Sequence, residues 1–406
     1  MREYLAYWTA MTRYAVRGSA DYHLWLGGLM VVIVAGAVAW GIQLRDGFIV
    51  TNLSDHVSWG AYIANFTFLV GVAAAAVLLV VPAYLLHRQD VKEVVLIGEL
   101  MAVSAIVMCL GFVTVDLGHP ERVLHMLPGF GRLNFPYFIL AWDVIVLSGY
   151  LLLNMHLPGY LLYKRYKRET PAKALYLPMV FLSVGWAVSI HTVTAFLYSG
   201  LGGRPFWNTA ILAPRFLVSA FAAGPAILLI AFLAINRTKA MKIGDSVFDM
   251  LRNISAFMLL LNYFLLGCEV FTEFYTGAAH SISARYLFFG IAGHGKLISY
   301  IWAGIALGGS AAVVFLVPAL RNTRLLVAAC LAATVGIWVE KGMGLIIPGF
   351  IPTPSGDLVE YGPSLIEFFV CLGIWALGAF VFTVLAKVAI AIQEGHLCAA
   401  NGGHAT

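Results

Sequence analysis

The sequence predicts an all-α integral membrane protein with ten membrane-spanning helices. Of its 406 residues, 61% are hydrophobic and 11% are charged, whereas about 25% of an ordinary soluble domain is charged. The mean hydropathy is +0.88. Because a spanning helix needs about 20 apolar residues, this length allows roughly ten spans joined by short loops. The composition excludes a soluble enzyme, a disordered chain and a disulfide-linked scaffold.

Ten long apolar runs follow one another along the chain, and most of them contain no charged residue. The first begins near Leu24, after a stretch that carries arginine and aromatic residues. It is long enough to span a membrane, which argues against a removable signal peptide. The predicted spans are residues 24–44, 57–86, 94–115, 136–157, 175–199, 214–235, 254–275, 297–320, 325–347 and 364–390.

The distribution of Lys and Arg predicts how these spans are oriented. Seventeen of the 25 basic residues fall on the side that holds both termini, and eight fall on the other side. Because basic loops are retained in the cytoplasm, both termini are expected to be cytoplasmic. The long loops rich in glycine and proline lie on the opposite, outer side, where we expect the working face of the protein. They are residues 116–135, 200–214, 276–296 and 347–363.

Three polar residues lie at a similar depth in three predicted spans. Asn65, Asp143 and His191 each sit 7 or 8 residues from the outer end of their helix, which is about 10–12 Å at ~1.5 Å per residue. Ionisable side chains inside a span are costly and often functional. Trp59 and Tyr62 share a helix side with Asn65 at helical spacing. Where the third span emerges, the patch would be covered by Asp116, His119, Arg122 and His125.

A polar patch with aromatic walls suits a quinone, whose two carbonyl oxygens need hydrogen bonds and, on reduction, protons. His and Asp side chains are suited to such proton exchange. Structural interpretations stand beside this one. Asn65 could join helices by hydrogen bonds, and Asp143 could pair with an outer-loop arginine. His191 could be a packed histidine or a single haem ligand, and His119 and His125 could be ordinary interfacial residues.

Further charged residues occur in other spans. The later part of the chain holds Glu269, Glu273, His294, Lys296, Glu340, Lys341 and Glu367. Opposite charges there predict either an ion-pair network that orients helices or a second proton or ion route. Glu99 is the one acid in the cytoplasmic half of the third span. It either opens a proton path towards Asp143 and His191 or pairs with a basic loop residue. The candidate proton path therefore consists of Glu99, Glu269 and Glu340.

The five cysteines are scattered along the chain, with no CxxC or CxxCH motif. Neither a clustered iron–sulfur motif nor covalent haem attachment is therefore encoded. We expect no metal site, haem or iron–sulfur cluster in this chain, so that electrons would come from another subunit.

Five segments carry a resemblance to a known family. WGAYIANFTFLVGVAAAAVLLV (59–80), DLGHPERVLHML (116–127) and AWDVIVLSGY (141–150) resemble the NrfD/PsrC-like membrane subunits of polysulfide-reductase-type complexes. SIHTVTAFLYSGLGGRPFWNTAILAPRFLVSAFAAGPA (189–226) and WVEKGMGLIIPGFIPTPSGDLVEYGPSLIEF (338–368) resemble the ten-helix branch of this family. That branch includes subunits of alternative complex III and of the Qrc, Dsr and Hmc complexes. The chain looks most like the Qrc-type menaquinone reductase subunit, followed by the Dsr-type and Hmc-type subunits.

The resemblance implies two four-helix bundles with peripheral helices, no haem, and a quinone site near the outer face. Asp143 and a histidine of residues 116–127 would flank the quinone head group. A periplasmic iron–sulfur subunit would dock there, with a molybdopterin-like subunit and a multihaem cytochrome c in the complex, and no nucleic acid. The implied organisation is a cytoplasmic segment (1–23), a peripheral helix and loop (24–56), the first bundle (57–199), the second bundle (200–347) and a last helix with its tail (348–406).

These observations together predict a quinone-binding subunit in a bacterial inner membrane. It would exchange electrons between an iron–sulfur partner and menaquinone at a periplasm-facing site, and proton uptake from the cytoplasm is left open. One alternative is a secondary transporter, whose site would lie at broken helices near the bilayer midplane. The other is a structural anchor for a periplasmic redox complex, in which the polar patch only joins helices.

Overall fold

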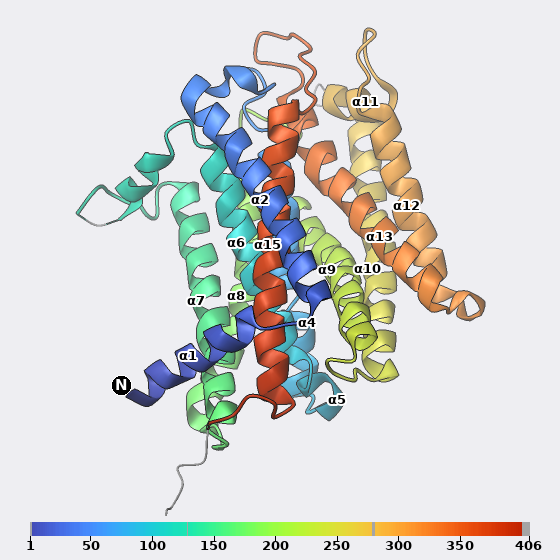
Figure 1. Ribbon diagram of the computed structural model, residues 1–406. Coiled ribbons are helices and arrows are strands. Elements are labelled where there is room, and N and C mark those ends of the chain that lie inside the picture. The colour runs from blue at the N-terminus through green and yellow to red at the C-terminus, as the bar shows by residue number, and fades with distance from the viewer. Residues whose placement is uncertain (1, 128, 278–280, 400–406) are drawn as a thin grey trace, which may run out of the picture.

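The computed structural model describes residues 2–127, 129–277 and 281–399, and within these ranges the ordered elements are helical (Figure 1). Ten helices are long and apolar enough to cross a membrane, which confirms the predicted all-α membrane fold. The α-helices are α1 (Arg2–Val16), α2 (Ala20–Asp46), α3 (Ala61–Ala74), α4 (Val77–Val80), α5 (Gln89–Lys92), α6 (Val95–Asp116), α7 (Ile139–Tyr166), α8 (Lys173–Ser199), α9 (Leu212–Thr238), α10 (Asp245–Tyr275), α11 (Ser281–Phe289), α12 (Ile298–Leu316), α13 (Thr323–Trp338), α14 (Gly344–Ile346) and α15 (Leu365–Gln393).

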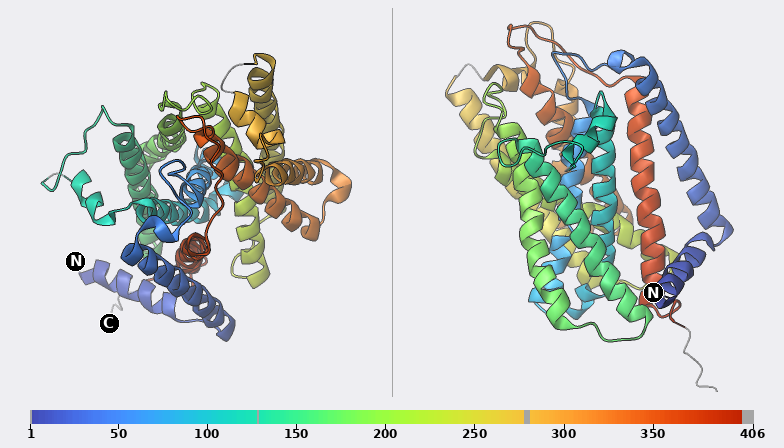
Figure 2. Two further views of the ribbon diagram at one scale, coloured as in Figure 1. Left: turned by 90° about the horizontal axis from the view of Figure 1, so that it is seen from above. Right: turned by 90° about the vertical axis from the view of Figure 1, so that its left-hand side faces the viewer.

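The spanning helices form two bundles of four. Helices α3, α6, α7 and α8 pack around one core, and α9, α10, α12 and α13 pack around another. The two bundles meet where α3 lies against α9. Helices α2 and α15 form a separate pair against α6 on the outside of the first bundle (Figure 2). A pair of bundles with peripheral helices is the arrangement that the family resemblance implies.

Helices α2 and α15 approach each other closely through glycine. A Cβ atom placed on Gly36 would lie 2.6 Å from the Cα atom of Gly373, which is closer than carbon atoms can pack. Small residues at such a crossing let two helix backbones come together, and the resulting van der Waals contact holds helices together in lipid. The pair depends on glycine at both positions.

Two spans contain a π-helical turn, an irregularity that is rare and often found at functional sites. In the second span, η2 (Val81–Leu85) contains Pro82, which has no backbone N–H to donate to the helical ladder. In the ninth span, η5 (Val339–Met343) follows α13 and carries Glu340 and Lys341, both of which are buried. The sequence analysis predicted one span over residues 325–347 with Glu340 and Lys341 in it, but it did not predict the π-helical turn that carries them.

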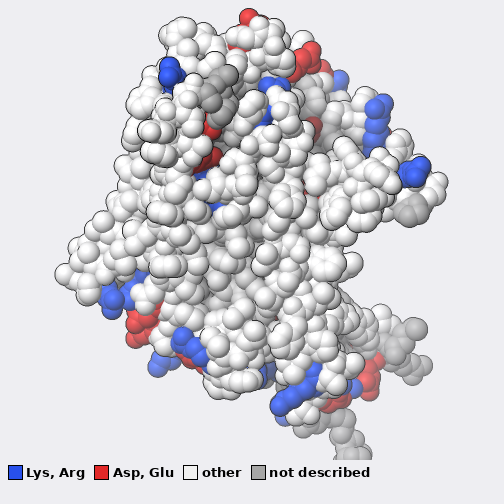
Figure 3. All heavy atoms as spheres, turned by 180° about the vertical axis from the view of Figure 1, so that it is seen from behind, with Lys and Arg blue, Asp and Glu red and all other residues white. Residues whose placement is uncertain are grey.

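The two ends of the molecule differ in the loops that they carry. The loops 47–60, 290–297 and 351–364 lie at the upper end in Figure 1, whereas α1, the last turn of α15 and the basic loops lie at the lower end. From the side shown in Figure 3, charged side chains gather at the two ends, and a few show between apolar atoms in the upper half. The basic loops and the loops rich in glycine and proline thus lie at opposite ends of the molecule, as the distribution of Lys and Arg predicted.

The sequence analysis did not predict helix α1 or the extensions of two spanning helices. Helix α7 continues to Tyr166, beyond the predicted limit of 157, and α10 begins at Asp245 rather than near 254. Both extensions are polar and lie at the basic end, where hydropathy no longer marks a helix. The ring of Tyr7 in α1 packs 5.0 Å from the rings of both Tyr163 and Tyr166, so α1 is anchored on the extension of α7.

Candidate functional site

Asp143 is the buried acid of the first bundle. It lies in the second turn of α7 and is 2% exposed. Its Oδ1 atom accepts a hydrogen bond of 2.8 Å from the hydroxyl of Thr194 on α8. Among the described residues no Lys, Arg or His forms an ion pair with it, so the alternative of an outer-loop arginine partner is not seen. A carboxyl group that is buried in a membrane span with one uncharged hydrogen-bond partner is costly to ionise. Groups that exchange protons within membranes are often found in such surroundings.

His191 lies one helical turn before Thr194 on α8 and is 1% exposed. Its Nε2 atom has no hydrogen-bond partner within the described part of the chain. The ring points at the contact between α3 and α9, because a Cβ atom on Gly71 would lie 3.6 Å from Nε2 and 3.3 Å from the Cβ atom of Ala220. His191 and Thr194 therefore lie on neighbouring turns of α8, and Thr194 links α8 to Asp143 on α7.

Asn65 and Tyr62 face the opposite side of α3, away from α7. The Asn65 Oδ1 atom accepts hydrogen bonds from the indoles of Trp338 (3.0 Å) and Trp375 (2.9 Å), which come from α13 and α15. The Tyr62 hydroxyl donates to the side chain of Gln43 on α2 at 2.6 Å. Helix α3 thus separates Asn65 and Tyr62 from Asp143 and His191, although the sequence predicted that they form one patch. The contacts of Asn65 match the interpretation in which this residue joins helices by hydrogen bonds.

Trp59 does not share a helix face with Tyr62, because α3 begins only at Ala61. Its ring instead stacks on Trp207 with 5.7 Å between ring centroids, and both rings contact Phe350. The indole N–H of Trp207 donates to the carbonyl oxygen of Leu345 at 2.8 Å. These aromatic rings close the upper end of the junction between the bundles. The sequence analysis missed Trp207, although a tryptophan beside the glycine pair of an outer loop was a usable signal.

The segment after α6 does not cover the patch. His119, Arg122 and His125 lie on or beside the 3₁₀ helix η3 (Pro120–Met126) and are exposed. Figures 1 and 2 show this segment reaching sideways, away from the helices. The Nδ1 atom of His119 lies 2.9 Å from the carboxylate of Glu121. Asp116 stays at the end of α6, where its Oδ1 atom is buried without a hydrogen-bond partner among the described residues.

Glu99 is the buried acid in the lower half of the first bundle. It is 2% exposed on α6, and its Oε2 atom has no hydrogen-bond partner in the described part of the chain. It lies near enough to Tyr84 and Tyr150 for charges on these groups to interact. Within the same ranges no basic loop residue forms an ion pair with Glu99, so the loop-pairing interpretation is not seen, and the proton path stays a prediction.

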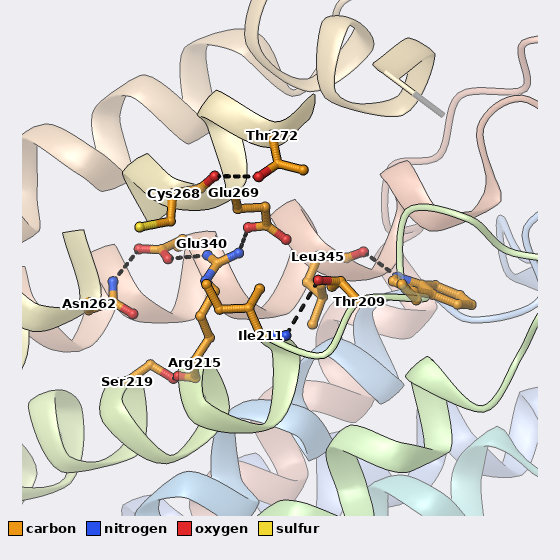
Figure 4. Close-up of polar contacts among 11 residues, drawn as sticks. Thr209, Ile211, Arg215, Ser219, Asn262, Cys268, Glu269, Thr272, Glu340 and Leu345 are labelled. Carbon is orange, nitrogen blue, oxygen red and sulfur yellow. Dashed lines mark hydrogen bonds and ion pairs between the residues drawn. The ribbon is translucent and has the colours of Figure 1, made fainter. Parts of the chain in front are cut away.

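An ion cluster forms the polar centre of the second bundle (Figure 4). The guanidinium of Arg215 on α9 forms ion pairs with Glu269 on α10 and, at 2.6 Å, with Glu340 on η5. The amide of Asn262 donates to the other oxygen of Glu340 at 2.9 Å. Glu340 therefore pairs with a residue of α9 rather than with its neighbour Lys341. Arg215 and the two glutamates thus pair with one another, and such pairing makes buried charges tolerable.

A small cavity lies beside this cluster. It has about 30 Å³ open to the centres of water molecules, and one water needs about 10–15 Å³ by this measure. The polar part of its wall includes Arg215, Asn262, Glu269, Glu340 and Lys341, and the apolar part includes phenylalanine and leucine side chains. The volume suits about two water molecules and is too small for a quinone head group.

No three His, Cys, Asp or Glu side chains gather into a possible metal site within residues 2–127, 129–277 and 281–399. The titratable groups of the described site are Asp143, His191, Glu99 and the ion cluster, side chains of types that can form hydrogen bonds and exchange protons.

The fold and these groups define a class of protein, a multi-pass membrane protein with two helical bundles and with buried acids in its first bundle that form no ion pair among the described residues. Residues 49–352 match the family model described as "Polysulphide reductase, NrfD", and the chain belongs to this family. The family assignment made from the sequence motifs is confirmed. The finer resemblance to the Qrc-type branch stays a prediction.

Three relatives are similar to the chain over most of its length. A putative membrane subunit of the dimethyl sulfoxide reductase of Halobacterium salinarum is 24% identical, with 88% of each chain covered. A subunit of the selenate reductase of Mesobacillus selenatarsenatis is 23% identical, with 89% of this chain and 92% of the relative covered. An Hdr-like menaquinol oxidoreductase integral membrane subunit of Archaeoglobus fulgidus is 24% identical, with 90% of this chain and 93% of the relative covered.

Proposed function

We propose that this protein is the quinone-exchanging membrane subunit of a multi-subunit oxidoreductase, with Asp143 exchanging protons at the quinone head group. The observation that carries the proposal is the burial of this carboxyl group within a span with a threonine hydroxyl as its hydrogen-bond partner. The names of the three relatives, all subunits of reductases or of a menaquinol oxidoreductase, support the same class.

A head group could reach Asp143 from the lipid along the seam between α6 and α7. Leu110 on α6, with Phe138 and Trp142 at the start of α7, are each exposed by more than a third, so apolar side chains open to lipid flank the buried acid. Asp143 would lie on the inner side of the head group. His119 would approach from η3 once a docked partner held that segment against the bundle, with Arg122, His125 and Asp116 nearby.

Quinone reduction consumes two electrons and two protons, and this chain's part is to supply the protons. Thr194 holds the Asp143 carboxyl at the site by its hydrogen bond. His191 would serve as the next proton-exchanging group inwards. The contacts of Trp59, Tyr62 and Asn65 suit a supporting role in the wall better than direct contact with a head group.

Protons could enter the first bundle from the basic, lower end through Glu99. Tyr150 lies two helical turns from Asp143 on the same side of α7, and Glu99 lies close to Tyr150. We therefore place Glu99 on the proton path from the cytoplasm. Glu269 and Glu340, which share Arg215, are better suited to holding α9, α10 and η5 together than to opening a second path.

The partner is proposed to be a periplasmic iron–sulfur subunit docked on residues 117–138. This segment exposes large apolar side chains outside the spans, including Phe130 at 70% and Tyr137 at 87%, and exposed apolar patches commonly mark interfaces. A molybdopterin-like subunit and a multihaem cytochrome c would complete the assembly in a bacterial inner membrane. Menaquinone is the favoured quinone, in keeping with the name of the Archaeoglobus relative.

The test compares Asp143→Asn with Asp55→Asn, which makes the same chemical change at an exposed position of an outer loop. The complex is purified, its bound quinone is extracted, and its electron exchange with a water-soluble menaquinone analogue is measured. We expect Asp143→Asn to lower turnover by about 10²-fold, the usual loss when a proton-transferring group is removed, and Asp55→Asn to have no effect.

Equal turnover in both variants would contradict the proposal and favour the structural anchor. Purification without any iron–sulfur protein and without bound quinone would favour the transporter.

A further inference from the structure

Lys341 lies where the two bundles meet. The π-helical turn η5 places it against α3, since a Cβ atom on the next residue, Gly342, would lie 3.2 Å from the carbonyl oxygen of Ala64. Its ammonium donates to the carbonyl oxygen of Phe216 at 2.6 Å and lies 4.0 Å from the centre of that ring. Among the described residues no carboxylate forms an ion pair with it, since the neighbouring Glu340 is engaged by Arg215 and Asn262.

Lys341 borders two separate spaces. One is the cavity of about 30 Å³ beside the ion cluster of the second bundle. The other is a narrow gap between α3 and α9, lined also by Gly71 and Ala220, that has no room for a water molecule. Lys341 and Ser219 are the two side chains that line both spaces. The Lys341 side chain therefore borders a space for water on one side and a dry gap on the other.

His191 lies beside the dry gap, at Gly71. A Cβ atom on Gly71, which lines the gap, would lie 3.6 Å from the Nε2 atom of His191, and this nitrogen has no hydrogen-bond partner among the described residues. Lys341 lines the same gap as Gly71, so the charge on its ammonium acts on the imidazole across this narrow space. Two like charges that face each other without intervening water repel strongly, because the medium between them has a low dielectric constant.

We propose that His191 and Lys341 carry one positive charge between them, so that Lys341 couples proton uptake in the first bundle to the second bundle. When His191 binds a proton, the Lys341 ammonium releases one of its protons to water in the second-bundle cavity and becomes a neutral amine. When His191 loses its proton, Lys341 takes one back from that water. Lys341 is thus a positioning residue for the charge of His191. Its link to quinone chemistry rests on the proposed function, whereas the coupling itself needs no quinone.

The other charged groups around the pair fit this exchange. On the second-bundle side the charged residues that line the cavity are Arg215, Glu269, Glu273 and Glu340. The ion pairs of Arg215 with Glu269 and Glu340 remain whichever state Lys341 adopts. The Oδ1 atom of Asn262, also in this wall, is buried without a partner among the described residues and can accept a hydrogen bond from cavity water. On the first-bundle side Asp143 is bonded to Thr194, one turn from His191.

The test is the protonation of His191 in the full chain, reconstituted in lipid without quinone. Protein labelled with ¹⁵N-histidine is titrated by solid-state NMR, and the His191 signal is assigned by its loss in His191→Gln. We expect Lys341→Met to raise the protonated fraction of His191 at pH 6 by about threefold or more, because the repelling charge is gone. Lys341→Arg keeps the charge and should leave the protonated fraction of His191 low.

Ser219→Ala, which changes the other side chain shared by both spaces, should match the unchanged protein. Equal titrations of His191 with and without Lys341 would overturn the proposal.

A reciprocal measurement covers the case in which Lys341→Met does not fold. Coupling between two sites acts equally in both directions, so in ¹⁵N-lysine-labelled His191→Gln the Lys341 ammonium should persist to higher pH than in the unchanged protein. An unchanged Lys341 signal would again overturn the coupling. Neither measurement involves quinone, so a failure of the coupling is distinct from a failure of Asp143→Asn to affect turnover.

Discussion

At the scale of single residues, the buried polar groups of this protein fall into two kinds. Arg215, Glu269 and Glu340 satisfy one another. Asp143 has a neutral partner, while Glu99 and His191 retain an atom with no partner among the described residues. Structural charges in proteins are paired, since an unpaired buried charge is costly. The incompletely satisfied groups are therefore the ones to which we assign proton exchange.

Asn65 provides the residue-scale prediction that separates a structural from a ligand-binding role. Asn65→Ala should lower the free energy of unfolding by about 1–3 kcal/mol, because two buried indole N–H groups lose their acceptor. Thermal unfolding of the purified complex measures this, and the exposed Asn208→Ala is the matched control. Affinity for the quinone analogue should be unchanged. Weaker quinone binding at an unchanged unfolding midpoint would instead indicate direct contact with the ligand.

At the scale of helices and loops, close contacts between backbones decide which elements pair. Glycine permits the α2–α15 crossing at Gly36 and Gly373, and it permits η5 to lie against α3 at Gly342. In lipid, where no hydrophobic effect drives helices together, such packing is a main source of association. The peripheral pair and the bundle junction therefore depend on small residues rather than on bulky ones.

The crossing of α2 and α15 can be tested with two glycines of the same helix. Gly36→Val would drive its side chain into the backbone of α15, whereas at Gly27 a Cβ atom has nothing within 4 Å. We expect Gly36→Val to lower the thermal midpoint of the purified complex by several degrees, consistent with an overpacking cost of about 1–3 kcal/mol. Gly27→Val should leave the midpoint unchanged. Equal effects of the two substitutions would contradict the close crossing.

Glu360 provides a prediction about pH for the loops at the upper end. Burial raises the pKa of its carboxyl, but hydrogen bonds from the backbone N–H of Lys296 and from the side chains of His294 and Tyr286 outweigh burial, so that the pKa lies below its ordinary value. A depressed carboxyl pKa adds stability above the unfolded-state pKa of about 4.3, and this stability is lost as the pH falls.

Glu360→Gln should therefore destabilise the protein at pH 7, and the difference from the unchanged protein should shrink when the pH is lowered from 5 to 3.5. Thermal unfolding midpoints over this range measure the effect. A difference that stays constant with pH would show that the carboxylate charge contributes nothing.

At the scale of the whole molecule, the protein has two unlike ends and two joined cores. The polar groups of the first bundle and the ion cluster of the second both lie inside the helical bundles, and α3 and α9 bring the two into contact. One end carries the basic loops, α1 and the last turn of α15, and the other carries the loops rich in glycine and proline. Which end faces the cytoplasm rests on the distribution of Lys and Arg.

Cysteine labelling tests this orientation. Asp55→Cys and Thr170→Cys place thiols in exposed loops at opposite ends, in a background with Cys398→Ser. In intact spheroplasts a membrane-impermeant maleimide should label Asp55→Cys within minutes and leave Thr170→Cys unlabelled until the cells are lysed. The reverse pattern would invert the predicted orientation and place the Asp143 site near the cytoplasmic face.

The fold class, the approximate limits of the ten spans and the family could all be predicted from the amino-acid sequence. Lipid requires long apolar helices, and such helices are visible as runs of hydropathy. Asp143, His191 and Glu99 stood out for the same reason, because a polar residue in an apolar run is conspicuous.

The helix faces that these residues occupy became visible only in the three-dimensional structure. Packing turned Asn65 away from Asp143, placed Arg215 between two glutamates, and set Lys341 between the bundles through a π-helical turn. A helix that is apolar on every side has no periodicity to indicate its rotation, so side-chain partners follow from packing alone.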